Sequence, residues 1–261
     1  MNNQTINEIN KRDIDKVFFS FSIISQDVFF NFGNDYIKKR TIYTIIGCNI
    51  NGIRKYISSI FEDDYTKSSD WYNFLLTLKK RGLEHIFFVS IPNNPLIKNA
   101  FELAFPNISF FYSCVNLINK LSHYTSASYS NNIFKHLYPI FLSKDLNEFE
   151  FRKNELFILY NDSPFIIDII NKELNFFSSF LDFPLLLRKH ILSFFFFRDF
   201  IKTLNVISHS QPYFYNITEF ENKLIPTIKS FELKMYSSKK EWNSIISYLY
   251  KDYKDLLLCV L

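Results

Sequence analysis

The fold is decided by residues 69–106, which read SDWYNFLLTLKKRGLEHIFFVSIPNNPLIKNAFELAFP. The first part of this stretch predicts an amphipathic helix, because apolar residues recur at helical spacing behind polar N-cap residues and the pattern ends at Gly82. The apolar face consists of Trp71, Phe74, Leu75 and Leu78. Such a face has to be buried, so the helix must pack on another layer of the protein.

The period of the apolar residues changes after Gly82. Residues 86–89 form a short unbroken apolar run, which is typical of a central strand covered on both faces. A turn follows, and a second amphipathic helix stops at Pro106, after which we expect a strand at residues 108–112. The apolar face of the second helix is predicted to be Leu96, Ala100, Leu103 and Ala104.

This pattern is the α/β half of a layered fold, in which ligands usually bind at the loop that leaves the carboxyl end of a strand. Here that loop is residues 90–95, and it contains no ionisable side chain. A hydrolase or a phosphoryl-transfer enzyme would be expected to carry an acid there.

Residues rich in β-formers precede the first helix and are separated by turns at Gly33 and Gly52. We expect them to pair as an antiparallel meander. Meander, helix, strand, helix and strand is the element order of a ribonuclease-H-like core, an α/β fold with a mixed five-stranded sheet flanked by helices. The strands predicted before the first helix are residues 17–24, 27–32, 41–46 and 53–61.

The rest of the chain is predicted to be helical. Helices are expected at residues 131–142, 146–160 and 165–175, and the last part has two helical patterns, one with an apolar face of Trp242, Ile245, Ile246 and Leu249. We predict a polar N-terminal segment, the core, a helical insertion, the end of the core and a C-terminal helical region. Their bounds are residues 1–16, 17–130, 131–180, 181–215 and 216–261.

Composition narrows the class of protein. The chain has 261 residues, of which 48% are hydrophobic and 21% charged, so it is globular. Its net charge of +4 is compatible with contact to nucleic acid without requiring it. Three dispersed cysteines indicate neither a disulfide framework nor a zinc module, and no apolar run is long enough for a signal peptide or a membrane span. We therefore expect a cytoplasmic protein without a membrane partner.

Three blocks of sequence together resemble the catalytic core of the mutator-type transposases of bacterial insertion sequences. They are Ile45-Ile46-Gly47-Cys48-Asn49 with Gly52, then WYNFLLTLKKRGL at residues 71–83, then AFELAFP at residues 100–106. Phe183-Pro184 stands where that family has a later FP pair. The resemblance covers residues 27–205 and implies a ribonuclease-H-like fold that cuts and rejoins DNA with two Mg²⁺ ions held by Asp, Asp and Glu. It also implies a long helical DNA-binding region ahead of the core, whereas 26 residues precede Asp27 here, so we predict a truncated member.

The resemblance places the family's three acids at positions that this sequence fills differently. Asp27 matches the first acid, at the start of the run Asp27-Val28-Phe29-Phe30. The second position falls at Ile91 and the third at Arg198, with Asp199 adjacent but pointing about 100° away on a helix. The family's Cys and His element is also altered, with Asn116 or Leu117 where the His would stand.

Two divalent ions need anionic ligands to offset their four positive charges. A guanidinium about 5 Å from such an ion would repel it by roughly 6–7 kcal/mol at an effective dielectric constant near 20. We therefore predict no bound metal or other cofactor and a degenerate catalytic site.

Two basic clusters are candidate DNA contacts if they share a face, and a solvated surface is the alternative for each. They are Lys38-Lys39-Arg40 and Lys79-Lys80-Arg81.

Three hypotheses for function follow. The first is a truncated transposase core that folds without cutting DNA, and the second is a non-catalytic module that binds DNA, another copy or a transposase through the same fold. The third is an active nuclease that rebuilt its acids from Asp27, Asp63, Asp64 or Asp199.

Overall fold

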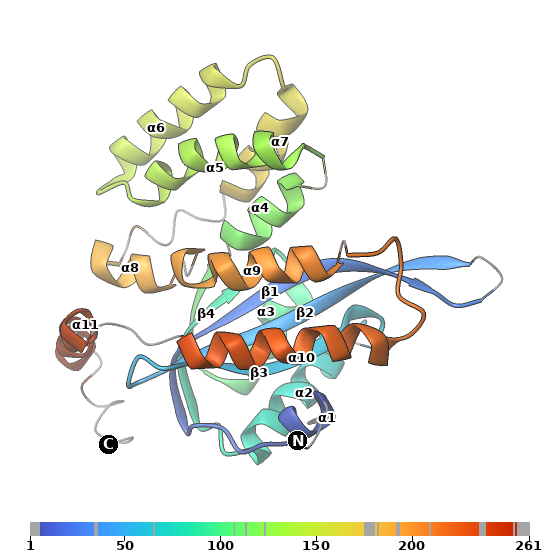
Figure 1. Ribbon diagram of the computed structural model, residues 1–261. Helices are drawn as coiled ribbons and strands as arrows, with labels where there is room; N and C mark the ends of the chain where they lie inside the picture. The colour runs from blue at the N-terminus through green and yellow to red at the C-terminus, as the bar shows by residue number, and fades with distance from the viewer. Residues whose placement is uncertain are drawn as a thin grey trace.

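The computed structural model describes residues 6–254 (Figure 1). Within that span the description omits residues 34–35, 65, 107, 113, 123, 175–180, 182, 192–193, 209, 235–238 and 253.

A five-stranded mixed sheet lies at the centre of the protein, in the order β3-β2-β1-β4-β5. β1, β2 and β3 are antiparallel neighbours, whereas β4 and β5 run parallel to β1, so the sheet joins a meander to two crossover connections. The predicted mixed five-stranded sheet flanked by helices is confirmed. The strands are β1 (Val17–Asn31), β2 (Ile37–Asn49), β3 (Arg54–Phe61), β4 (His85–Ile91) and β5 (Ser109–Tyr112).

The long hairpin of β1 and β2 corrects one prediction. The sequence predicts two strands at residues 17–24 and 27–32, but β1 is a single strand whose pairing with β2 continues from Phe18 to Asn31. The polar residues between the two apolar runs stay in the ladder because their side chains line a cavity instead of the core. β2 likewise begins at Ile37, four residues before the predicted start.

One face of the sheet is covered by α2 (Ser68–Lys80) and α3 (Pro95–Ala104). The predicted face of α2 is buried as expected. The predicted face of α3 is partly wrong: Leu103 is 69% exposed, and Ile97 and Phe101 are buried in its place. The buried residues Ile97, Ala100, Phe101 and Ala104 follow helical spacing, and Leu103 falls outside that face. Asn94 caps the start of the helix by accepting a hydrogen bond from the backbone N–H of Leu96.

The opposite face packs on helices from the later part of the chain (Figure 1). The predicted stripe of the last helix is confirmed, with Trp242, Ile245 and Leu249 buried against the sheet layer. The helices of this layer are α4 (Cys114–Ser122), α8 (Leu185–Ile191), α9 (Phe194–Ser208), α10 (Ile217–Lys234) and α11 (Lys239–Asp252). A one-turn helix, α1 (Ile6–Ile9), and a 3-10 turn, Glu62–Asp64, complete the sheet region.

A separate helical group stands beside the sheet layers (Figure 1). It consists of α5 (Ala127–Phe141), α6 (Leu146–Leu159) and α7 (Pro164–Leu174), close to the three helices predicted there. Among the described helices, none combines the length and the apolarity that crossing a bilayer requires.

Candidate functional site

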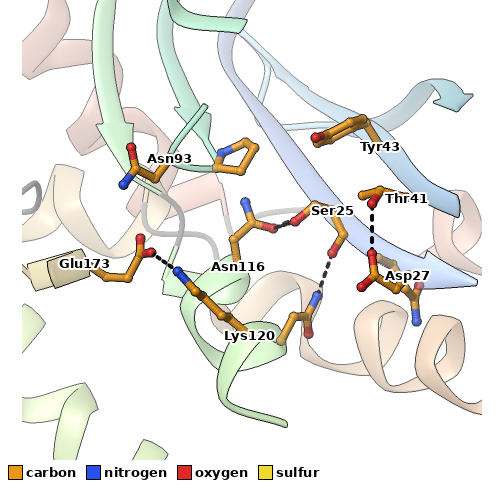
Figure 2. A pocket seen from close by; sticks show the side chains of 11 residues that line it. Ser25, Asp27, Thr41, Tyr43, Asn93, Asn116, Lys120 and Glu173 are labelled. Carbon is orange, nitrogen blue, oxygen red and sulfur yellow. Dashed lines mark hydrogen bonds and ion pairs between the residues drawn. The ribbon is translucent and has the colours of Figure 1, made fainter. Parts of the chain in front are cut away.

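A polar cavity of about 250 Å³ opens just past the carboxyl end of β4 (Figure 2). Pairing between the parallel strands β1 and β4 ends at Ser22 and Ser90. β1 continues beyond this pair, and its next residues border the cavity. The lining comes from β1, β2, the loop after β4, α4 and α7. It comprises Ser25, Gln26, Asp27, Thr41, Tyr43, Pro92, Asn93, Asn116, Asn119, Lys120 and Glu173.

Asp27 lies on the β1 wall of this cavity, and its side chain is 17% exposed. Lys39 Nζ donates to Asp27 Oδ2 at 2.8 Å, and Thr41 Oγ1 donates to Oδ1 at 2.9 Å. Both partners stand on β2, where Asp27 pairs directly with Thr41. The hydrogen bond to Asp27 raises the pKa of Lys39, so the ammonium remains charged beside the carboxylate.

Glu173 forms the opposite wall and was not anticipated from the sequence. Its side chain is 10% exposed, and Lys120 Nζ donates to its Oε1 at 2.8 Å. The sequence carries one signal for it, because Glu173 continues the apolar stripe of Ile166, Ile169 and Ile170 at helical spacing. A lone carboxylate on a buried stripe needs a cationic or hydrogen-bonding partner.

Two asparagines of α4 complete the hydrogen bonds of β1 where β4 has ended. Asn116 Oδ1 accepts from the backbone N–H and the hydroxyl of Ser25, and its Nδ2 donates to the carbonyl of Ile23 at 2.9 Å. Asn119 Nδ2 donates to the carbonyl of Ser25 at 3.0 Å. Of the two residues predicted for the altered His position, Asn116 therefore borders the cavity, while Leu117 is buried in the core.

The other two predicted acid positions lie as follows. Ile91 is the last residue of β4 and packs into the core under α2 and α3, while its successors Pro92 and Asn93 border the cavity. Arg198 lies in α9, and its side chain, like that of Asp199, is outside the described residues. α9 passes close to this part of β1, because Gln26 Nε2 donates to Asn205 Oδ1 at 2.7 Å.

Of the six predicted DNA contacts, the four lysines are exposed, whereas the two arginines make contacts within the protein. Arg40 is buried, with its guanidinium 4.5 Å from the centre of the Phe61 ring, and Arg81 donates to the carbonyls of Arg12 and Ile57. Lys38 pairs with Asp63 at 2.7 Å and Lys39 with Asp27. The ammonium of Lys79 lies 4.7 Å from the centre of the Phe105 ring. The exposed residues of the two clusters are Lys38, Lys39, Lys79 and Lys80.

The described residues do not fit a pair of divalent ions. The cavity offers two carboxylates, Asp27 and Glu173, and a lysine already neutralises each. The loop after β4 contributes a proline and an amide instead of an acid. Across the part of the chain that the structure describes, no three His, Cys, Asp or Glu side chains gather where they could hold a metal ion.

Comparison with family models places the chain in a known family. The family model described as "Transposase, Mutator family" matches residues 2–206, a span that includes the whole sheet and every residue lining the cavity. None of the curated proteins compared with the chain matches it.

Proposed function

Because the chain belongs to the Mutator family of transposases, we propose that its core has a ribonuclease-H-like fold that contacts DNA but no longer cuts it. The strand order β3-β2-β1-β4-β5, with β1, β4 and β5 parallel, supports this fold. The cavity at the carboxyl end of β4 supports the position of a former catalytic site, since ligands of such sheets bind there.

The proposed loss of DNA cleavage rests on the kinds of side chain that this cavity offers to metal ions. Two-metal chemistry on a phosphodiester needs several anionic oxygens directed at one point. Here Asp27 is paired with Lys39, the loop after β4 presents Pro92 and Asn93, and Arg198 stands at the third position of the family pattern. Retained contact with DNA would come from the exposed lysines of the two basic clusters, Lys38, Lys39, Lys79 and Lys80.

The first experiment tests the chemistry by adding acids, at Pro92 because its neighbour Ile91 is buried in the core while Pro92 borders the cavity, and at Arg198. Calorimetric titration with Mn²⁺ should give no binding heat for the natural chain and a clear isotherm for the double variant Pro92→Asp with Arg198→Glu. The control double variant Asn99→Asp with Lys202→Glu changes the charge equally at exposed positions of α3 and α9 and should not bind. Two-site Mn²⁺ binding by the natural chain, or DNA strand cleavage that Asp27→Ala abolishes, would refute the proposed loss of cutting.

The second experiment tests DNA contact separately. Affinity for duplex DNA, measured across a salt series, should fall with a logarithmic slope of about −0.9 for each phosphate neutralised. Changing Lys38, Lys39 and Lys80 to glutamine should reduce that slope by about 2–3. The same change at the exposed Lys144, Lys172 and Lys229 serves as the control and should leave it unchanged. A natural chain without salt-dependent binding would leave protein interaction as the function of the module.

A further inference from the structure

α6 is apolar on two opposite sides. Its inner side packs Phe149 and Leu156 into the core of the helical group. Phe151 and Ile158 lie on the other side and are 62% and 74% exposed. A surface helix normally turns a polar face to water, and an exposed apolar stripe marks an interaction site more often than an ordinary surface.

Four exposed residues of α6 form a stripe, defined here as Phe151, Asn154, Glu155 and Ile158, while Leu146, Asn147 and Leu159 are exposed towards the ends of the helix. Asn154 and Glu155 are neighbours, and each lies three or four residues from both Phe151 and Ile158, so the four side chains share one face of the helix. α6 lies at the outer edge of the helical group, away from the sheet, and no residue that the structure describes covers the stripe (Figure 1). The 14 residues of α6 extend over about 21 Å.

The stripe is self-complementary when two copies pair antiparallel about a two-fold axis between residues 154 and 155. Phe151 then faces the partner's Ile158, and Asn154 faces the partner's Glu155, whose carboxylate can accept from the amide. The ends carry opposite charges, because Lys144 before α6 and the partner's Asp162 after it are about three residues from facing each other in this register. A parallel arrangement would instead place Glu155 against Glu155 and Lys144 against Lys144.

We infer that the outer face of α6 is an interface with a second copy of this chain, formed by antiparallel packing of the two helices. Charge does not favour nucleic acid as the occupant, because Glu155 lies on the stripe and the two cations of the helix, Arg152 and Lys153, already pair with Glu148 and Glu150. A contact along one helix of about 21 Å is short compared with a standard interface, so we expect a weak dimer that depends on concentration. This inference does not depend on the proposed loss of cutting.

Sedimentation equilibrium of the full chain tests the dimer. The natural chain should show a monomer and dimer equilibrium with a dissociation constant on the order of 10–100 µM, as expected for a small interface. Ile158→Lys should raise that constant at least about tenfold, because each interface contains the change twice. Leu103→Lys, at a residue 69% exposed on α3, is the matched control and should leave it unchanged.

Cross-linking tests the orientation of the two helices. In a background carrying Cys114→Ser and Cys259→Ser, Glu155→Cys lies beside the axis and should form a disulfide-linked dimer under mild oxidation. Asn147→Cys should not, because antiparallel mates at that position are about 22 Å apart. The remaining Cys48 is buried, and burial raises the pKa of its thiol to about 11, so it stays unreactive.

Four outcomes would overturn the inference. They are a natural chain that stays monomeric at several hundred micromolar, a dimer that survives Ile158→Lys, a dimer weakened equally by Leu103→Lys, and cross-linking through Asn147→Cys as efficient as through Glu155→Cys. Loss of duplex DNA binding in Ile158→Lys would identify the face as a nucleic-acid contact instead.

Discussion

Gly47 lies in β2 next to the ring of Phe18 from the neighbouring strand. A Cβ at position 47 would lie 2.5 Å from Phe18 Cδ1 and 3.0 Å from Phe21 Cε1, both closer than ordinary contacts. Phe18 and Phe21 are fully buried and stack edge to face with ring centres 4.9 Å apart, so neither ring can move aside freely. The glycine of the Ile45–Asn49 run is therefore needed for packing.

Gly47→Ala should lower the free energy of unfolding by about 1–3 kcal/mol, because it overpacks a filled core. Phe18→Leu in the same chain should recover part of that loss by removing the ring atoms that the new methyl group meets. Urea denaturation of both single variants and the double variant measures the coupling between the two positions. Strictly additive effects would contradict the proposed contact.

Glu221 is a half-buried residue of α10, and burial raises the pKa of its carboxyl group above the ordinary value of 4.5. Folding therefore favours the protonated form, so the charged form lowers stability above the folded pKa, and this penalty disappears as the pH falls below 4.5. Glu221→Gln should raise the melting temperature at pH 7 and change it little near pH 4. Calorimetric scans at both pH values measure the difference.

Glu219, two residues earlier, is the control with the opposite sign. Hydrogen bonds from Gln211 and from the backbone N–H of Tyr215 lower its pKa, so its charged form stabilises the fold above the ordinary pKa and this contribution is lost on acidification. Glu219→Gln should lower the melting temperature at pH 7. Equal shifts in both variants would show that the burial of Glu221 has no energetic effect.

Residue patterns gave part of the candidate site and missed the rest for a physical reason. Asp27 was predicted from its resemblance to a family motif and does line the cavity. Glu173 and Lys120 were missed because they come from α7 and α4, and only the tertiary fold brings these helices beside β1. A sequence shows how far apart residues are along the chain, whereas the cavity depends on how close they lie in the folded protein.

At the scale of elements, helices with one buried face were predictable, and features that depend on a neighbour were not. The face of α2 followed from its period, whereas the face of α3 was misplaced because Leu103 extends its apolar pattern into solvent. The continuity of β1 was hidden because Ser25, Gln26 and Asp27 interrupt the apolar run at the cavity.

The two C-terminal helices, α10 and α11, contact segments from the first part of the chain. The family model ends at residue 206, yet α11 packs onto the turn between β2 and β3. Trp242 Nε1 donates to the carbonyl of Ile50, and its ring covers Gly52, where φ is +77° and a Cβ would lie 2.7 Å from the indole. Arg12 and Glu232 similarly tie the N-terminal segment to α10.

At the scale of the whole molecule, the order of elements predicted the layers because each apolar pattern must be buried against another. The outer face of α6 was not predicted, because apolar residues on a helix are expected to be buried in the core. Only their exposure in the folded chain separates the two sides of that helix.

The sheet separates two cores, and each core holds one of the two tryptophans of the chain. Trp71 belongs to the layer of α2 and α3, and Trp242 to the opposite layer. Fluorescence of Trp71→Phe and Trp242→Phe variants therefore reports on one layer at a time, with the natural chromophores as optical labels. Coincident melting curves would mean that both sides of the sheet unfold as one cooperative unit, and a gap between them would reveal which side opens first.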